Sequence, residues 1–165
     1  MRATESQYAE TQAFPGWTYA LLFGSGLAPI GLLLLTPFVT GRDIQVVAPA
    51  LRGLVALIPV WLALGNLLYM RTTLSDEALT VSFGWLFSLY RRTIPLRDIA
   101  FAEAVRYNPL AEFGGWGIRG TGDSQALNAR GDRGVRIRLR DGRRLLIGSQ
   151  RAEELAEAIG RQPYA

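Results

Sequence analysis

The chain has 165 residues, a formal net charge of +4, and no cysteine, histidine or lysine. It therefore has no disulfide framework, no thiolate or imidazole metal site and no cysteine nucleophile, and it lacks the commonest general base. These absences exclude most hydrolase and metalloenzyme classes.

Two long apolar segments, 17–39 and 46–70, follow a short polar start, and the first of them contains no charged side chain. A helix over 17–39 is about 35 Å long, enough to cross a hydrocarbon core of about 30 Å. The second segment also crosses if Arg52, about 9 Å from its start, extends to the interface. We therefore predict a transmembrane helical hairpin over 17–70, preceded by a cytoplasmic tail of residues 1–16.

Small residues form a stripe on one face of the first predicted helix, at Ala20, Gly24 and Ala28. Such a stripe lets helix backbones approach closely in lipid. The short turn between the two segments favours an intramolecular contact with the second helix. Homo-oligomerisation through the same stripe is the alternative. Prolines within both segments predict bends or helix ends.

Arginines near the ends of the predicted helices indicate their orientation. Arg2, Arg71, Arg91 and Arg92 lie on the side of the two termini, whereas Arg42 lies in the turn. The excess of positive charge beside the termini predicts that both are cytoplasmic and that the hairpin crosses the inner (cell) membrane. All 18 basic residues are arginine, which we attribute to GC-rich coding in a bacterium.

From residue 71 to 165 the sequence is polar, rich in glycine and patterned as β-strands. The predicted strands are 72–74, 79–83, 88–94, 99–107, 117–119, 126–128, 135–140 and 143–147. Asp141-Gly142 predicts a type I′ turn between the last two strands. After Ser149 the apolar period becomes helical, with Leu155 and Ile159 on one face. These patterns predict one soluble domain over 71–165, in which a bent antiparallel sheet is capped by a C-terminal helix.

Three stretches of this domain resemble the bacterial pleckstrin-homology-like (PH-like) domains: 74–81, 94–99, and the hairpin at 141–142 that leads to 147–149 and the final helix. In many such proteins a pair of transmembrane helices precedes the domain. The resemblance implies an α+β membrane protein with about seven strands in a bent sheet or barrel closed by one helix. Asp76 and Glu77 stand where the lipid-binding pattern has a basic cluster, so phosphoinositide recognition is not implied.

A row of arginines is the first candidate binding surface. Arg136, Arg138 and Arg140 alternate with apolar residues and so lie on one sheet face, and Arg143 or Arg144 from the returning strand can join them. Several guanidinium groups on one surface can bind phosphate oxygens bidentately. We predict that this row contacts anionic lipid or a partner. A solvated strand face, neutralised by neighbouring carboxylates, is the alternative.

The glycine-rich segment 108–134 is the second candidate, and its candidate contact residues are Tyr107, Phe113, Trp116 and Arg119. Residues 115–120 match G-x-G-x-x-G, but turn residues follow in place of the helix that a dinucleotide site requires, so we expect no cofactor. The alternative for the segment is structural: flanking glycines with positive φ turn the Trp116 ring inward over the sheet.

These observations predict a non-catalytic, membrane-anchored interaction module that docks on anionic lipid of the inner leaflet or on another membrane protein. No metal, cofactor or nucleic-acid partner is expected, since no recognised motif for one accompanies the charge. The alternative is a membrane-tethered enzyme that uses carboxylates such as Asp98, Glu103 and Glu112 beside the glycine-rich segment.

Overall fold

The computed structural model describes residues 7–41, 43–121 and 123–161. Arg2 and Arg42, which contribute to the orientation argument, lie outside the described residues. The chain divides into two compact units. The sheet unit comprises Met1–Ala13 and Leu68–Ala165, and the helical unit comprises Phe14–Leu67. The helical unit is thus an insertion in the sequence of the sheet unit.

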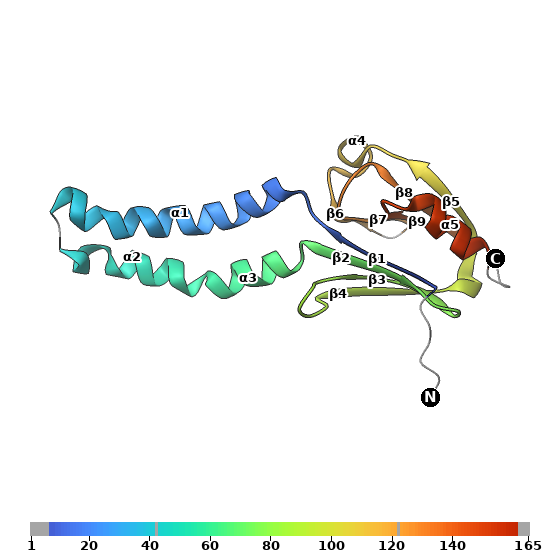
Figure 1. The fold of residues 1–165 in the computed structure, drawn as a ribbon, viewed down its shortest axis with the longest axis horizontal. Coiled ribbons are helices and arrows are strands. Elements are labelled where there is room, and N and C mark those ends of the chain that lie inside the picture. The colour runs from blue at the N-terminus through green and yellow to red at the C-terminus, as the bar shows by residue number, and fades with distance from the viewer. Residues whose placement is uncertain (1–6, 42, 122, 162–165) are drawn as a thin grey trace, which may run out of the picture. The chain divides into compact units, whose positions relative to one another are not determined.

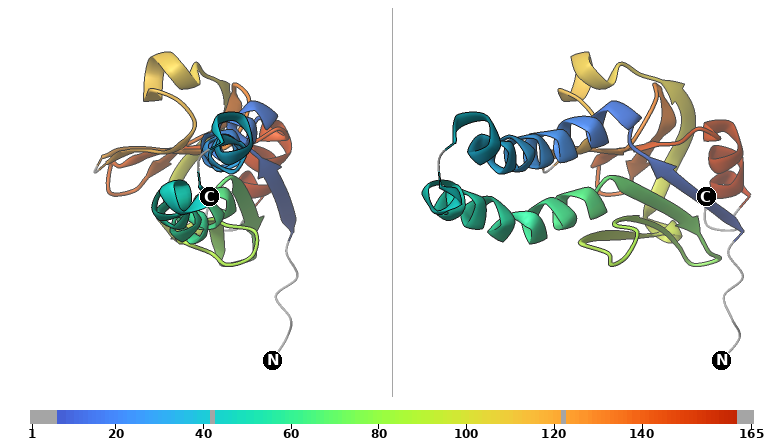
Figure 2. Two further views of the ribbon diagram at one scale, coloured as in Figure 1. Left: turned by 90° about the vertical axis from the view of Figure 1, so that its left-hand side faces the viewer. Right: turned by 60° about the vertical axis from the view of Figure 1, so that its left-hand side comes forward.

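The helical unit contains α1 (Gly16–Thr40), α2 (Ile44–Ala56) and α3 (Ile58–Asn66). Figures 1 and 2 show α1 running antiparallel beside α2 and α3. The helices Gly16–Thr40 and Ile44–Asn66 are long and apolar enough to cross a membrane, and only 6% of the apolar window of each is buried. The predicted helix 46–70 is interrupted at Leu57, because Pro59 has no N–H to continue the hydrogen-bond ladder.

The contact between α1 and α3 is made at glycines outside the predicted stripe. A Cβ on Gly26 would lie 2.8 Å from the Trp61 ring, and one on Gly65 would lie 3.2 Å from the Phe23 ring. The residues of the predicted stripe are all exposed: Ala20, Gly24 and Ala28. The intramolecular contact predicted for the stripe is therefore wrong, because the helices meet where an aromatic ring on one faces a glycine on the other. Homo-oligomerisation through the stripe stays a prediction.

The first sheet of the sheet unit is antiparallel, in the order β1-β2-β3-β4. Its strands are β1 (Tyr8–Ala13), β2 (Tyr69–Leu74), β3 (Ala78–Phe83) and β4 (Tyr90–Pro95). Strand β1 lies within the segment 1–16, for which the sequence predicted only a tail. Two of its three inward residues are Glu10 and Gln12, both buried, so the alternation of apolar and polar residues that marks a strand is missing.

The second sheet has the order β5-β8-β9-β7-β6, with β7 and β9 parallel and the other pairs antiparallel. Its strands are β5 (Ile99–Arg106), β6 (Gly117–Thr121), β7 (Ser124–Asn128), β8 (Arg133–Leu139) and β9 (Arg144–Gly148). The short helices η1 (Leu96–Asp98) and α4 (Pro109–Phe113) flank β5.

Helix α5 (Ala152–Gly160) packs against β5 and β8 through Leu155 and Ile159, as the helical period predicts. The α+β class and the C-terminal helix are therefore confirmed. The strand count and closure differ from the expectation: the described residues form nine strands in two open sheets, with no closed barrel.

The turn at Asp141-Gly142 is not of type I′, which needs positive φ at both central residues. Gly142 has φ of +91°, but no described residue other than glycine has positive φ. The N–H of Gly142 donates to the Leu139 carbonyl at 3.0 Å, and the Leu139 N–H donates to the Arg143 carbonyl at 2.8 Å. The loop is therefore three residues long, with glycine at its left-handed position.

Candidate functional site

The predicted arginine row is present only in part. Arg136 and Arg138 project from the exposed side of β8. Arg136 lies 3.9 Å from Glu103 and 3.8 Å from Glu112, measured between nitrogen and oxygen atoms. The guanidinium of Arg138 lies 6.0 Å from the centroid of the Phe101 ring. Carboxylates from β5 and α4 thus offset the charge of Arg136.

The other two arginines of the row make their contacts in the β8–β9 loop region. The Nε–H of Arg140 donates to the Arg97 carbonyl at 2.8 Å. Arg143 pairs with Asp141 at 2.6 Å. Hydrogen bonding between these two groups lowers the pKa of Asp141 and raises the pKa of Arg143. The row carries less unpaired positive charge than its sequence predicts, and its role as a lipid contact stays a prediction.

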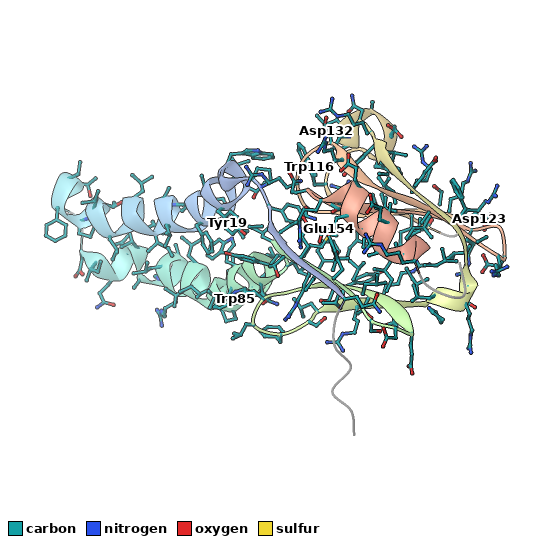
Figure 3. The ribbon with its side chains drawn as sticks, turned by 45° about the vertical axis from the view of Figure 1, so that its right-hand side comes forward. Tyr19, Trp85, Trp116, Asp123, Asp132 and Glu154 are labelled. Carbon is teal, nitrogen blue, oxygen red and sulfur yellow. The ribbon has the colours of Figure 1, made fainter. Side chains whose placement is uncertain are left out.

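Trp116 and Arg119 are brought together in the glycine-rich segment. Gly115 and Gly117 have φ of +126° and +112°, as expected for glycines that turn the chain on both sides of a large ring. The half-buried Trp116 donates its indole N–H to the Gly131 carbonyl at 3.0 Å, next to the loop that carries Asp132 in Figure 3. The Nε–H of Arg119 donates to the Trp116 carbonyl at 3.0 Å. These contacts support the structural interpretation of the segment. Strand β6, not a helix, begins inside the G-x-G-x-x-G match.

The carboxylates of the enzyme alternative do not form a separate cluster. Glu103 and Glu112 both contact Arg136, whereas Asp98 lies 3.9 Å from Arg97 on η1. A hollow of about 410 Å³ beside β7 and β9 includes Glu112 in its lining, together with Arg136. Each of the three carboxylates therefore has an arginine close to it.

A buried polar network around β1 was missed by the sequence reasoning. The carboxylate of Glu10 accepts hydrogen bonds from the Tyr8 hydroxyl at 2.6 Å, the Ser149 hydroxyl at 2.7 Å and the Gln150 N–H at 2.9 Å. Burial, together with the bond to Glu10, raises the pKa of Tyr8 above its usual value of 10. The Arg151 guanidinium lies 4.7 Å from the Tyr8 ring centroid. This network fastens β1 to the junction between β9 and α5.

The loop between β3 and β4, residues 84–89, carries a cluster of exposed apolar and aromatic side chains, and we call it the β3–β4 tip. Trp85, Leu86 and Phe87 are 68%, 71% and 51% exposed. Figure 3 labels Trp85 at this end of the hairpin. The tip is anchored at its base, because the Gly84 N–H donates to the Tyr69 carbonyl at 2.8 Å, and the Tyr69 and Trp85 ring centroids are 6.3 Å apart.

A polar row crosses the outer face of the first sheet next to the tip. In the strand register, Arg71 on β2 lies opposite Ser82 on β3, and Ser82 lies opposite Arg91 on β4. These residues and the tip line one hollow of about 430 Å³, which also includes Thr73 and Thr80. From the sequence, Arg71 and Arg91 indicate only the orientation of the predicted helices. The consecutive apolar residues after Gly84, which neither a half-buried strand nor a polar turn explains, are the signal that could have identified this site.

Comparisons with known proteins add no family to this description. A scan against protein-family models and a search of curated proteins give no match to the sequence.

Proposed function

We propose that this chain is a non-catalytic, membrane-anchored interaction module of the bacterial PH-like kind. In this proposal the helical unit crosses the inner membrane, both termini are cytoplasmic, and the sheet unit docks on anionic lipid of the cytoplasmic leaflet. The observation that carries the proposal is the exposed apolar surface of the helices Gly16–Thr40 and Ile44–Asn66, which water does not favour but a bilayer does.

Chain connectivity supports docking close to the bilayer. Ala13 at the end of β1 lies opposite Tyr69 at the start of β2. Only two residues separate Ala13 from α1, and two separate α3 from Tyr69. An extended chain covers at most about 3.6 Å per residue, so each junction spans no more than about 11 Å. If the helices cross a membrane, this end of the first sheet is therefore held at its surface.

The arrangement of the sheet unit supports the PH-like assignment in part. Two sheets are followed by a single C-terminal helix that packs on β5 and β8, in the order that the resemblance implies. The nine described strands and the parallel pair of β7 with β9 depart from a seven-stranded antiparallel sheet. The net charge of +4 favours an anionic surface as the partner.

Extraction of isolated membranes tests the anchoring. The full chain should stay with the membrane pellet in alkaline carbonate and be released only by detergent. The matched control is a closed variant, in which Asn-Gly replaces residues 14–68 and joins Ala13 to Tyr69. This control keeps the sheet unit but should be released by carbonate. Release of the full chain under the same conditions would contradict the proposal. A second protein that stays bound in fixed ratio after detergent extraction would favour a protein partner over lipid.

A further inference from the structure

The β3–β4 tip combines apolar and basic groups in an arrangement that suits a lipid surface. Trp85, Leu86 and Phe87 project from the end of the hairpin, and Leu89 is also 48% exposed. Clustered exposed apolar side chains of this size indicate an interaction site. Tryptophan and phenylalanine are typical of segments that enter the boundary between headgroups and acyl chains.

The two arginines beside the tip differ from those of the predicted row. Arg71 and Arg91 are both exposed, and among the described residues neither forms an ion pair with a carboxylate. They flank the small side chain of Ser82 at a separation of two strand spacings, about 10 Å. Two long arginine side chains can reach inward from both sides of such a gap and bind one phosphate group.

The two ends of the first sheet carry charge of opposite sign. The acidic turn with Asp76 and Glu77 connects β2 to β3 at the end opposite the tip. A strand of six residues is about 20 Å long. An anionic surface would therefore attract the end with Arg71 and Arg91 and repel the end with the acidic turn.

The tip also lies at the end of the sheet from which the chain enters the helical unit. Tyr69, which binds Gly84 and contacts Trp85, follows the last residue of α3 by three positions. The chain between them reaches no more than about 11 Å. On the proposed function, on which this inference rests, the tip is therefore within reach of the bilayer surface whatever the orientation of the sheet unit.

From these observations we infer that the β3–β4 tip inserts into the membrane interface and that Arg71 and Arg91 bind the phosphate of an anionic phospholipid in the adjoining hollow. The tip supplies depth of insertion, because its side chains are apolar. The arginine pair supplies preference for anionic lipid, because each basic group near such a surface contributes a factor of about five to the equilibrium.

The absence of cysteine from the chain allows a direct test in the full-length protein. Leu86→Cys is labelled with an environment-sensitive fluorophore, and the protein is reconstituted in vesicles of phosphatidylcholine with or without phosphatidylglycerol. The label should be quenched by lipids that carry a spin label near the headgroup, and it should be shielded from aqueous iodide. Leu110→Cys is the matched control, since Leu110 is 65% exposed but lies on α4, and its label should respond only to iodide.

The charge requirement is tested by Arg71→Gln with Arg91→Gln in the same labelled protein. The pair of substitutions should reduce the effect of phosphatidylglycerol on tip insertion by about 25-fold. Arg106→Gln is the matched control, because Arg106 is an exposed arginine of the second sheet outside both candidate surfaces and its substitution should leave the effect unchanged. Loss of the effect in Arg138→Gln alone would assign lipid binding to the predicted row and overturn the inference.

Two further outcomes would also overturn it. A label at residue 86 that iodide reaches as readily as the label at residue 110 would show that the tip stays in water. A label shielded from iodide but not quenched by lipid would show that protein covers the tip. Flotation of the vesicles separates these results from failure of the proposed function. Protein that does not float with the lipid would contradict the proposed membrane anchoring. Protein that floats but has an exposed tip would contradict only this inference.

Discussion

Replacing residues 14–68 by Asn-Gly is expected to yield a soluble and cooperatively folded sheet unit, whereas a fragment that begins at Leu68 should not fold stably. Ala13 and Tyr69 are directly opposite in the antiparallel pair of β1 and β2. A two-residue Asn-Gly connection is therefore long enough to join them without a change of register. The fragment that begins at Leu68 lacks β1 altogether.

The size of the effect follows from what β1 buries. Tyr8 is 3% exposed, and removal of a buried aromatic side chain costs about 3–5 kcal/mol. Glu10 accepts two hydrogen bonds from outside β1, from the Ser149 hydroxyl and the Gln150 N–H, and these donors would then lack a partner at about 1–3 kcal/mol for each buried donor left unsatisfied. The total is comparable with the whole stability of a typical domain, about 5–15 kcal/mol.

Circular dichroism during urea unfolding measures the difference. The closed variant should show one cooperative transition, and Glu10→Ala within it should lower the free energy of unfolding by about 1–3 kcal/mol for each buried donor left without a partner. Arg138→Ala, at an exposed position on β8, is the control and should change it by less than about 0.5 kcal/mol. The reasoning would be refuted if the fragment lacking β1 were as stable as the closed variant to within about 1 kcal/mol.

Four further predictions concern single positions. In the closed variant, Gly117→Ala should lower the free energy of unfolding by about 1 kcal/mol or more, because φ at Gly117 is +112°. Trp116→Ala should lower the free energy of unfolding by less than the roughly 3–5 kcal/mol expected for a fully buried ring, because the indole is only half-buried. Burial raises the pKa of Tyr107 to about 12. The folded state therefore keeps a proton that the unfolded chain loses above pH about 10, and the free energy of unfolding should fall by about 1.4 kcal/mol per pH unit between these two pH values. Urea transitions measured over a series of pH values should show a shallower fall for Tyr107→Phe. In the full chain, Gly26→Val should lower the melting temperature in detergent, because a Cβ there would lie 2.8 Å from Trp61, and an unchanged melting temperature would contradict the helix packing.

The elements with a regular apolar period were predictable from the sequence. Helix α1 matches the predicted segment 17–39 to within one residue at each end, because its long apolar run is continuous and bounded by polar or turn residues. The strands on either side of the β8–β9 loop and the face of α5 with Leu155 and Ile159 follow from the periods of two and 3.6 residues. A pattern of this kind is contained within one helix or strand, so it can be recognised without knowing what that element packs against.

Features that depend on distant parts of the chain could not be predicted in the same way. Strand β1 has polar inward residues, Glu10 and Gln12, whose partners include Gly148, Ser149 and Gln150, about 140 positions away. The pairing of Arg136 with Glu103 and Glu112 depends on the register of β5 against β8 and on the position of α4. The site beside the tip was missed because strand register is what brings Arg71 and Arg91 to one hollow.

Accessibility of single cysteines in intact cells tests the central proposal, a membrane-anchored module with its sheet unit in the cytoplasm. Thr40→Cys lies at the end of α1 and Ser124→Cys lies at the exposed start of β7, and neither competes with a native thiol. A membrane-impermeant maleimide should label the cysteine at position 40 in intact cells and the one at position 124 only after the membrane is opened. Equal labelling of both positions before permeabilisation, or of neither, would contradict the account, and labelling of position 124 alone would invert the proposed orientation.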